Sequence, residues 1–347
     1  APAMAAMATP DQRVRTTDGV VVGTVDLGVA AFKGIPFAAP PEGALRWQAP
    51  RPAEPWRQPR PATTYGADCM QEPIATDAAP MGTTPAEDCL YLNVWKPAKA
   101  GAKPRPVVVW IFGGGLMNGG ASPPTYAMDA FARSGVVAVS FNYRVGRFGF
   151  FAHPAILAEA KGAPSVNFGH LDAMAALRWV QRNIGAFGGD PRQVTIMGES
   201  AGGGQVLTLL TSPLSRDAGL FSRAIMQSAG LPGGRKDQLP LRDLASARAV
   251  SLDYARSIGI EGEDAEALAK LRAVPAEELA KGVNLITGVL TMLAGVGPKG
   301  ITGPVVDGQV FAEAPEDALV AGRFARVPIL VGANDYETGQ SFDRSKD

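Results

Sequence analysis

The chain has 347 residues and a formal net charge of zero, with 33 basic and 33 acidic side chains. That length can bury a substantial core, as one large domain or two ordinary ones. A hydrophobic content of 46% with 19% charged residues is typical of a globular enzyme and argues against disorder, and the lack of a basic stripe argues against nucleic acid as a partner.

The N-terminal residues 1–10 are small and apolar but lack the charged start and long apolar core of a signal peptide. They fit the remnant of a processed secreted protein or a disordered tail. The two cysteines, Cys69 and Cys89, flank nineteen residues rich in Pro, Ala, Thr and Gly. Such a segment suits a surface loop closed by a disulfide, which would indicate an oxidising compartment and a secreted or periplasmic protein.

Continuous apolar runs predict strands buried on both faces, and hence a largely parallel sheet. These runs are residues 107–112, 136–141, 193–197, 224–227 and 328–332. Among them, residues 172–185 repeat apolar side chains at helical spacing, so the pattern is α/β. Residues 240–300 are rich in Leu, Ala and Glu and predict a helical insertion over the sheet, with an ordinary second subdomain as the alternative.

The most apolar window, residues 282–298, is 17 residues long and is interrupted by glycines and an asparagine. It is therefore not expected to span a membrane. A lid or pocket-lining segment is the interpretation we favour, with a plain core helix as the alternative. Residues 285–293 within it are a candidate wall for an acyl pocket.

The pentapeptide Gly-Glu-Ser-Ala-Gly at 198–202 has the pattern G-x-S-x-G. It follows a short apolar strand at 194–197 and leads through small residues into an apolar run at 206–210. A strand, a sharp turn and a helix form the setting of a nucleophile elbow, where glycines relieve crowding around the serine. Ser200 is thus the candidate nucleophile, and a plain glycine-rich turn is the alternative.

A glycine triplet at 113–115 follows the apolar run that begins at Val109. An attacked ester carbonyl becomes an oxyanion, which needs N–H donors fixed in advance. Beside a nucleophile elbow, one donor is the amide after the serine, here Ala201, and another comes from a glycine-rich loop after an earlier strand. No Lys-Ser or Lys-Thr follows the triplet, so a phosphate-binding loop is unsupported. Leu116, the next residue, is expected to line the substrate pocket.

Two long segments resemble the type-B carboxylesterase family, the cholinesterase-like branch of the α/β hydrolases. Residues 87–97, Glu-Asp-Cys-Leu-Tyr-Leu-Asn-Val-Trp-Lys-Pro, are similar to the family's second signature, and residues 187–202 to its serine active-site signature. The resemblance runs from about residue 13 to residue 340. It implies one α/β-hydrolase catalytic domain over 1–347, with a mostly parallel sheet flanked by helices and the 240–300 helical insertion after the nucleophile.

The resemblance implies hydrolysis of a small-molecule carboxylic ester through a Ser-Glu-His triad and an acyl-enzyme, with no cofactor; the cysteine and histidine spacing matches no metal site. It also implies a role for each residue that matches a family motif. These are Ser200 as nucleophile; Gly114, Gly115 and Ala201 as oxyanion-hole donors; Glu199 as the acidic neighbour that tunes the site's field; Ser228 as a supporting serine; and Cys69 with Cys89 as the family's first disulfide.

The acid implied by the resemblance is Glu337, in Gly-Ala-Asn-Asp-Tyr-Glu at 332–337. Family members usually have Asp-Glu-Gly there, whereas this chain has Tyr-Glu-Thr at 336–338. Asp335 is therefore an alternative acid, and a solvated loop carboxylate is the plainer interpretation of Glu337. A second departure is Phe112, where relatives commonly have histidine or tyrosine.

The family's catalytic histidine lies well downstream of the acid, but the histidines of this chain, His153 and His170, both precede Ser200. Both are expected to be structural or surface residues. We therefore expect a C-terminally incomplete catalytic domain, with the base supplied by a C-terminal polypeptide segment. The alternatives are a non-catalytic cholinesterase-like binding module and an esterase that uses His170.

Overall fold

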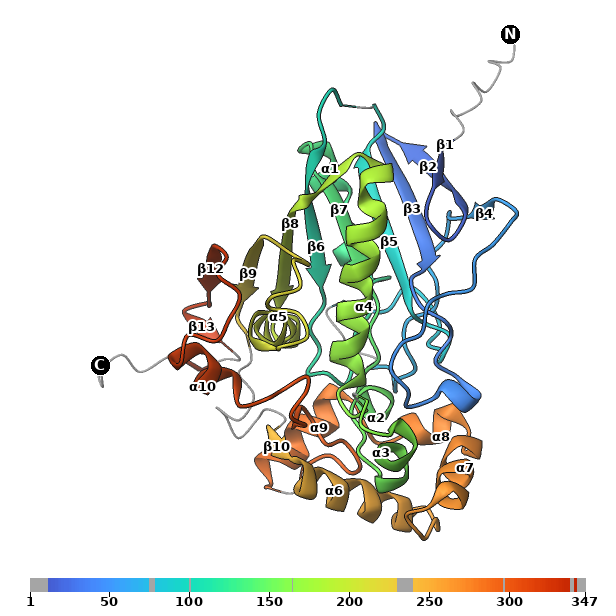
Figure 1. Cartoon of the computed structure of the whole chain (residues 1–347), viewed down its shortest axis with the longest axis vertical. Coiled ribbons are helices and arrows are strands. Elements are labelled where there is room, and N and C mark those ends of the chain that lie inside the picture. The colour runs from blue at the N-terminus through green and yellow to red at the C-terminus, as the bar shows by residue number, and fades with distance from the viewer. Residues whose placement is uncertain are drawn as a thin grey trace.

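The computed structural model describes residues 12–74, 79–99, 101–163, 165–229, 240–295, 297–337 and 340–341. Within these ranges, helices pack against a twisted central sheet, and a group of further helices gathers beyond one end of the strands (Figure 1). The N-terminal segment 1–10 and residues 75–78 of the predicted cysteine loop lie outside the described residues.

The central sheet runs in the order β1-β2-β3-β5-β7-β6-β8-β9-β12, with β4 paired to β2. Its strands are β1 (Gln12–Arg15), β2 (Val20–Asp26), β3 (Val29–Pro36), β4 (Arg60–Pro61), β5 (Tyr91–Pro97), β6 (Arg105–Ile111), β7 (Val137–Phe141), β8 (Gly189–Glu199), β9 (Arg223–Gln227) and β12 (Ile329–Gly332). From β7 to β12 every neighbouring pair is parallel, and β1, β2, β3 and β5 add an antiparallel flank. The parallel half coincides with the predicted apolar runs.

The helices and short turns are distributed along the whole chain. They are η1 (Gly43–Leu45), η2 (Pro124–Tyr126), α1 (Asp129–Arg133), α2 (Gly146–Gly149), α3 (Pro154–Ala160), α4 (Phe168–Asn183), η3 (Ile184–Phe187), α5 (Ala201–Thr211), α6 (Leu244–Ser257), α7 (Ala265–Ala273), α8 (Ala276–Ala280), α9 (Leu285–Leu293) and α10 (Pro315–Val320). The helix expected at 172–185 is α4, which begins four residues earlier because its first turn, with Gly169 and His170, carries no apolar periodicity. Two small sheets pair β10 (Arg242–Asp243) with β11 (Val305–Val306), and β13 (Tyr336–Glu337) with β14 (Gln340–Ser341).

The segment 240–300 is helical, as its composition predicted. Helices α6 to α9 lie together at the lower end of the molecule in Figure 1, beyond the sheet. The β10–β11 pair holds the start of this segment against the chain that leaves it. In the part of the chain that the structure describes, no helix has both the length and the apolar character needed to cross a membrane.

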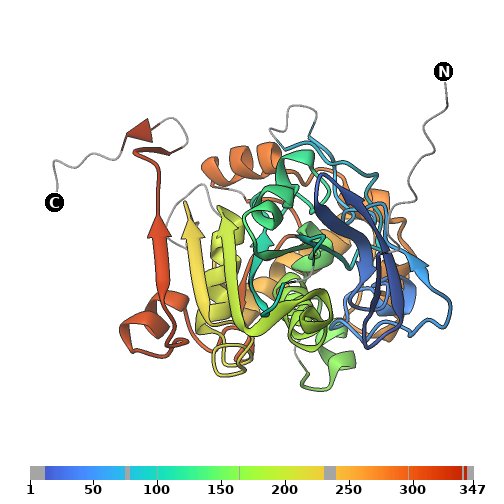
Figure 2. The same cartoon turned by 90° about the horizontal axis from the view of Figure 1, so that it is seen from above.

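Strand β12 departs from the expectation of burial on both faces. It lies at the edge of the sheet, paired on one side with β9 (Figure 2). Its residues Ile329, Leu330 and Val331 are 37%, 63% and 65% exposed. The prediction of burial was wrong here because a continuous apolar run indicates only a tendency to be buried, whereas the described residues leave this strand partly exposed.

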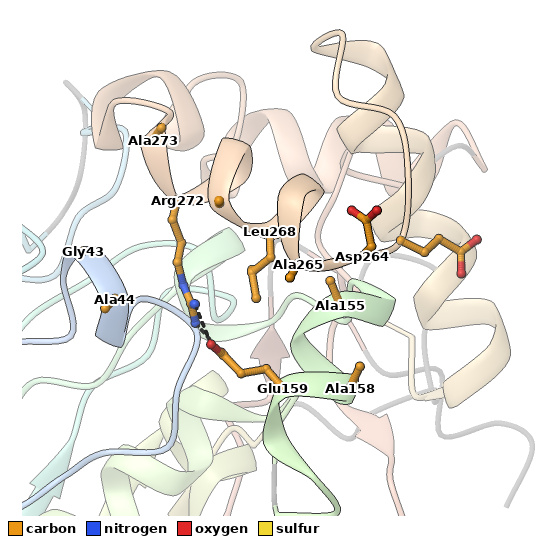
Figure 3. Close-up of a pocket in the computed structure, with 12 residues that line it drawn as sticks. Gly43, Ala44, Ala155, Ala158, Glu159, Asp264, Ala265, Leu268, Arg272 and Ala273 are labelled. Carbon is orange, nitrogen blue, oxygen red and sulfur yellow. Dashed lines mark hydrogen bonds and ion pairs between the residues drawn. The ribbon is translucent and has the colours of Figure 1, made fainter.

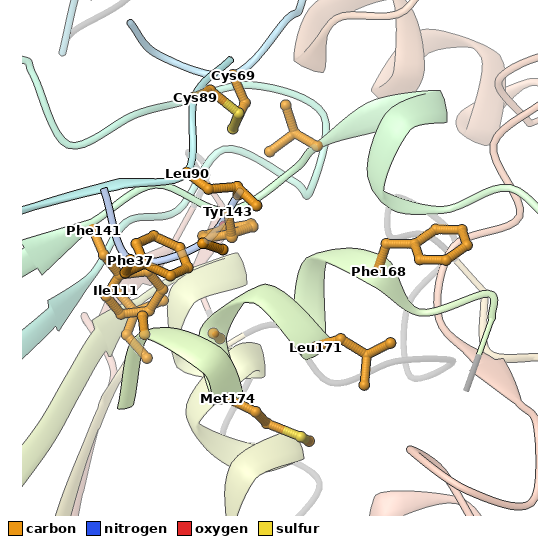
Figure 4. Packing of buried hydrophobic residues seen from close by; sticks show 14 of the residues in the cluster. Phe37, Cys69, Cys89, Leu90, Ile111, Phe141, Tyr143, Phe168, Leu171 and Met174 are labelled. Atoms are coloured by element: carbon orange, nitrogen blue, oxygen red, sulfur yellow. A yellow bond between two sulfur atoms is a disulfide. The ribbon is translucent and has the colours of Figure 1, made fainter. Parts of the chain in front are cut away.

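The two cysteines form a disulfide that is buried in the main core. Cys69 and Cys89 are bonded with an S–S distance of 2.04 Å, and they belong to the same buried cluster as Leu90 and Tyr143 (Figure 4). Within the described residues the disulfide therefore anchors the start and end of the segment 70–88 to the packed interior beneath the end of the sheet. This confirms the pairing that the family resemblance implied.

Candidate functional site

Ser200 occupies the sharp turn between β8 and α5. Its backbone has φ +54° and ψ −123°, a strained conformation for a residue with a side chain. The Ser200 N–H donates to the Gln227 carbonyl at 2.9 Å, which ties the turn to the end of β9. A β-carbon built on Gly202 would lie 2.1 Å from the Ile111 carbonyl oxygen, so only glycine lets the helix start so close to β6. This geometry is that of the predicted elbow.

The glycine triplet lies against the elbow because β6 and β8 are parallel neighbours in the sheet. A β-carbon built on Gly113 would lie 3.0 Å from Ser200 Cβ. Within the described ranges, the N–H groups of Gly114, Gly115 and Ala201 have no hydrogen-bond acceptor, and all three residues are half-buried. Unpaired, accessible backbone donors beside a serine form a cradle that an oxyanion can fill.

The residues that flank the triplet are held firmly. Phe112 stacks on Tyr143 with ring centroids 4.2 Å apart, and the Tyr143 hydroxyl donates to the Phe112 carbonyl at 2.8 Å. The phenylalanine that departs from the family pattern therefore packs in the core and leaves the glycine donors in place. Leu116 is largely buried, with φ +61°, and its carbonyl accepts from the Gly146 N–H at 2.7 Å.

The carboxylate of Glu337 lies among polar groups. Its Oε1 accepts from the Ser228 hydroxyl at 2.5 Å and from the Asn334 N–H at 2.7 Å. Asp335, the alternative acid, is exposed. Burial raises the pKa of Glu199, and the nearby negative charge of Glu337 raises it further. The structure thus brings Glu337, Ser228 and Glu199 into the neighbourhood of Ser200.

The histidines are placed elsewhere. His170 lies in the first turn of α4, buried between the rings of Phe150 and Phe311, and its Nδ1 is 2.5 Å from Gln205 Oε1. Burial lowers the pKa of His170 to about 4, although the hydrogen bond to Gln205 opposes the shift. His153 caps the N-terminus of α3, where its Nδ1 accepts from the Ala155 N–H at 3.3 Å. Neither imidazole contacts Ser200 in the described structure.

A cavity of about 680 Å³ lies away from all these residues, between η1, α3 and α7. Half of its lining residues are alanines, and the Arg272 guanidinium pairs with the Glu159 carboxylate across it at 2.6 Å (Figure 3). It contains none of the predicted site residues, and volume alone therefore does not locate the chemistry. In the described part of the chain, no three His, Cys, Asp or Glu side chains are grouped so that they could hold a metal ion.

Two buried amides near the triplet, Gln71 and Asn118, were not singled out from the sequence. Asn118 donates to the Glu72 carbonyl at 2.8 Å and accepts from the Leu285 N–H at 2.6 Å. Gln71 binds both backbone groups of Gly119, at 2.7 and 2.8 Å. Neither residue belongs to a periodic pattern. The one signal in the sequence concerned Asn118, a polar residue that follows the glycine triplet and the two apolar residues after it.

The sheet is parallel around a strained serine, which lies between a strand and a helix. A glycine loop follows the adjacent strand, and its Gly114 and Gly115 N–H groups have no acceptor among the described residues. This arrangement defines an α/β hydrolase with a nucleophile elbow. The model of the carboxylesterase family matches residues 10–346. The chain is 41% identical over 340 residues to fumonisin B1 esterase of Sphingopyxis macrogoltabida, covering 98% of this chain and 58% of that protein. It is 38% identical over 337 residues to para-nitrobenzyl esterase of Bacillus subtilis, covering 94% of this chain and 63% of the relative.

Solved structures give the same result. A PNB esterase superposes with a TM-score of 0.80 at 36% identity, covering 97% of this chain and 66% of that one. A carboxylesterase of Geobacillus stearothermophilus superposes with a TM-score of 0.73 at 40% identity, covering 92% of this chain and 61% of that one. The chain therefore belongs to the carboxylesterase family, and it spans about 58 to 63% of the length of the curated bacterial relatives named above.

Proposed function

We propose that this chain carries the nucleophile, the oxyanion-binding amides and the acid of a serine carboxylesterase. The observation that carries the proposal is the strained Ser200 turn beside the glycine loop, where the N–H groups of Gly114, Gly115 and Ala201 have no acceptor among the described residues. In this reaction Ser200 Oγ attacks the ester carbonyl carbon while its proton passes to a histidine base. The carbonyl oxygen becomes an oxyanion held by the three amides.

Collapse of this intermediate breaks the bond to the alcohol, which leaves with the proton from the histidine, and an acyl-enzyme remains. Water then attacks the acyl carbon, gives a proton to the same histidine, and releases the carboxylic acid as Ser200 is reprotonated. Glu337 is the proposed acid that orients the histidine. Its engagement by Ser228 and Asn334, set against the exposure of Asp335, supports Glu337 as the residue that acts.

We propose that the histidine comes from a polypeptide segment outside the 347 residues. Two observations support this. His170 is committed to Gln205 between two aromatic rings, and His153 is committed to a helix cap. In addition, the apolar edge strand β12, which leads to Glu337, is exposed and offers a surface for such a segment to cover.

The wider organisation is proposed in the same way. Residues 1–347 belong to one α/β-hydrolase catalytic domain that is C-terminally incomplete in this chain, and residues 240–300 act as its lid region, with 285–293 and Leu116 lining the substrate pocket. The contact of Leu285 with Gly115 supports that lining, since a β-carbon on Gly115 would lie 2.7 Å from Leu285 Cδ1. The Cys69–Cys89 disulfide supports a secreted or periplasmic location. The substrate is a small-molecule carboxylic ester.

The test is covalent labelling of the purified native protein with a fluorophosphonate, together with hydrolysis of a p-nitrobenzyl ester and of fumonisin B1, two substrates taken from the names of the relatives. We expect an adduct on Ser200, none in Ser200→Ala, and a loss of roughly 10³-fold or more in kcat for Glu337→Gln. Asp335→Asn is the matched control and is expected to retain activity within about threefold. Loss of activity in Asp335→Asn but not in Glu337→Gln would reverse the assignment of the acid.

The absence of a histidine near Ser200 favours one other function, a non-catalytic binding module of the same fold. A module of that kind would neither label at Ser200 nor hydrolyse either ester. The intact mass of the native protein, reduced and denatured, separates the cases further. A species of 36.1 kDa alone that does not label would overturn the esterase proposal, whereas additional polypeptide together with labelling at Ser200 would support it.

A further inference from the structure

The loop that carries Gly114 packs against the backbone of Asn118 and is hydrogen-bonded to it. The Gly114 carbonyl accepts hydrogen bonds from the N–H groups of Met117 and Asn118, at 3.1 and 3.0 Å. A β-carbon built on Gly114, which has φ +105°, would lie only 2.3 Å from the Asn118 carbonyl oxygen. Because the two peptides are in contact, we expect a displacement of Asn118 to displace Gly114 as well.

The Asn118 side chain is buried and fully hydrogen-bonded. Its Nδ2 donates to the Glu72 carbonyl at 2.8 Å and to Gln71 Oε1 at 3.2 Å, and its Oδ1 accepts from the Leu285 N–H at 2.6 Å. Leu285 is the first residue of α9, so this bond satisfies one of the N–H groups that a helix start leaves without a partner. The amide therefore joins the oxyanion loop to the helix that covers it.

Gln71 fixes the same loop one residue further on. Its Nε2 donates to the carbonyls of Gly119 and Cys69, at 2.7 and 2.8 Å, and its Oε1 accepts from the Gly119 N–H at 2.8 Å. Gln71 is itself buried, two residues after the half-cystine Cys69. The disulfide thus anchors Gln71, Gln71 anchors Gly119 and Asn118, and Asn118 supports Gly114.

Helix α9 reaches the neighbouring donor by a second route. Leu285, whose N–H binds Asn118, also places its side chain over Gly115, where a β-carbon would lie 2.7 Å from Leu285 Cδ1. The start of α9 is therefore in contact with Gly115 directly and with Gly114 through Asn118. Helix α9 thus supports both Gly114 and Gly115, whose N–H groups have no acceptor among the described residues.

We propose that Asn118 and Gln71 are positioning residues for acyl transfer, which hold the Gly114 and Gly115 amides at the oxyanion and couple their placement to α9. This proposal rests on the proposed esterase function. Oxyanion donors act through pre-set geometry, and the loss of one donor costs roughly 10²- to 10³-fold in kcat. Displacing a donor, rather than removing it, is expected to cost somewhat less.

The test compares two buried asparagines that both hold the same loop. Asn118→Asp keeps the acceptor for the Leu285 N–H but puts an oxygen against Gln71 Oε1 and the Glu72 carbonyl. Asn142→Asp is the matched control: Asn142 is buried, accepts from the Ala121 N–H and donates to the Ala67 carbonyl, both at 2.8 Å, at the far end of the loop. Both variants lose one donor in a buried site, so similar losses of stability are expected.

The measurements are kcat and KM for a p-nitrobenzyl ester, the inhibition constant of a trifluoromethyl ketone, and the midpoint of urea unfolding. The ketone adds to the serine and places an oxyanion in the same cradle, so it reports the geometry of the amides. For Asn118→Asp we expect a fall of about 10- to 100-fold in kcat, a change in KM of less than about threefold, and a loss of ketone affinity that parallels kcat/KM. For Asn142→Asp we expect kcat and ketone affinity within about threefold of the unsubstituted protein.

Gln71→Glu, which keeps the acceptor for the Gly119 N–H, is expected to behave like Asn118→Asp and serves as the second variant if that protein folds poorly. The inference is overturned if Asn118→Asp and Gln71→Glu retain full ketone affinity, or if Asn142→Asp loses as much of it. Failure of the esterase function itself would be seen differently, because the unsubstituted protein would then neither hydrolyse the ester nor bind the ketone.

Discussion

Replacing His170 by asparagine is expected to make the stability of the protein less dependent on pH below neutrality. The imidazole is buried between Phe150 and Phe311, with Gln205 as its polar partner. Burial lowers the pKa of His170 from 6.5 to about 4. In the unfolded chain the imidazole regains its ordinary pKa, so between these two pH values the unfolded state binds a proton that the folded state does not.

The sign and size of the effect follow from this difference. The stability that the protein gains by keeping His170 neutral is fully present above pH 6.5, and it is lost as the pH falls toward 4. The whole difference corresponds to about 3 kcal/mol, of which about 2 kcal/mol is gone at pH 5. Asparagine does not titrate, but its Nδ2 can still donate to Gln205. The packing lost with the ring lowers stability by the same amount at every pH.

The assay is urea unfolding of both proteins at pH 8 and pH 5, followed by intrinsic fluorescence. The free-energy difference between the unsubstituted protein and His170→Asn is expected to shrink by about 2 kcal/mol at the lower pH. Phe187→Leu is the control, since it loosens the core packing against Phe32 and Trp179 rather than against His170, and it should lower stability equally at both pH values. Parallel pH profiles for the unsubstituted protein and His170→Asn would refute the reasoning. Loss of esterase activity in a folded His170→Asn would instead support this histidine as the base.

Two further perturbations test the packing around the site. Gly202→Ala is expected to destabilise the fold by about 3 kcal/mol or more, because the new β-carbon would lie 2.1 Å from the Ile111 carbonyl oxygen. Gly185→Ala, with no atom within 4 Å of its β-carbon, should change the urea midpoint little, and equal effects of the two would contradict this account. Replacing Cys69 and Cys89 together by alanine is expected to cost about 3 kcal/mol of unfolding free energy, from the chain entropy of a loop closed over a separation of 20 residues. The same loss should appear on reducing the unsubstituted protein, and a reductant-insensitive midpoint would show that the loop is held without the bond.

The elbow and the glycine loop were predictable from the sequence because their steric demands are local. A serine at φ +54°, and a helix start at which a β-carbon on Gly202 would lie 2.1 Å from the Ile111 carbonyl oxygen, need glycines at fixed positions. The motifs G-x-S-x-G and Gly-Gly-Gly show those positions in the sequence. The parallel strands β6, β7, β8 and β9 were likewise legible, since burial on both faces leaves continuous apolar runs.

The support beneath the site was not predictable in this way. Gln71 and Asn118 meet across 47 positions of sequence, and their bond arises from tertiary packing rather than from any period or motif. The state of His170 was equally hidden, because its pKa is set by residues on three other segments, Phe150, Gln205 and Phe311. Side-chain hydrogen bonds between distant segments produce no local pattern in the sequence, so they become visible only in the three-dimensional structure.

Strand β12 is informative because its sequence and its surroundings disagree. Ile329, Leu330 and Val331 form a run typical of a central strand, yet they are 37% to 65% exposed at the sheet edge. Exposed apolar strands at an edge invite pairing with another polypeptide. The same strand leads to Glu337, whose carboxylate accepts a hydrogen bond from Ser228. After burial, the charge of Glu337 is the second cause of the raised pKa of Glu199. A segment that covers β12 would therefore lie next to the proposed acid. An esterase whose triad follows the chain order Ser, Glu, His needs its histidine at that place.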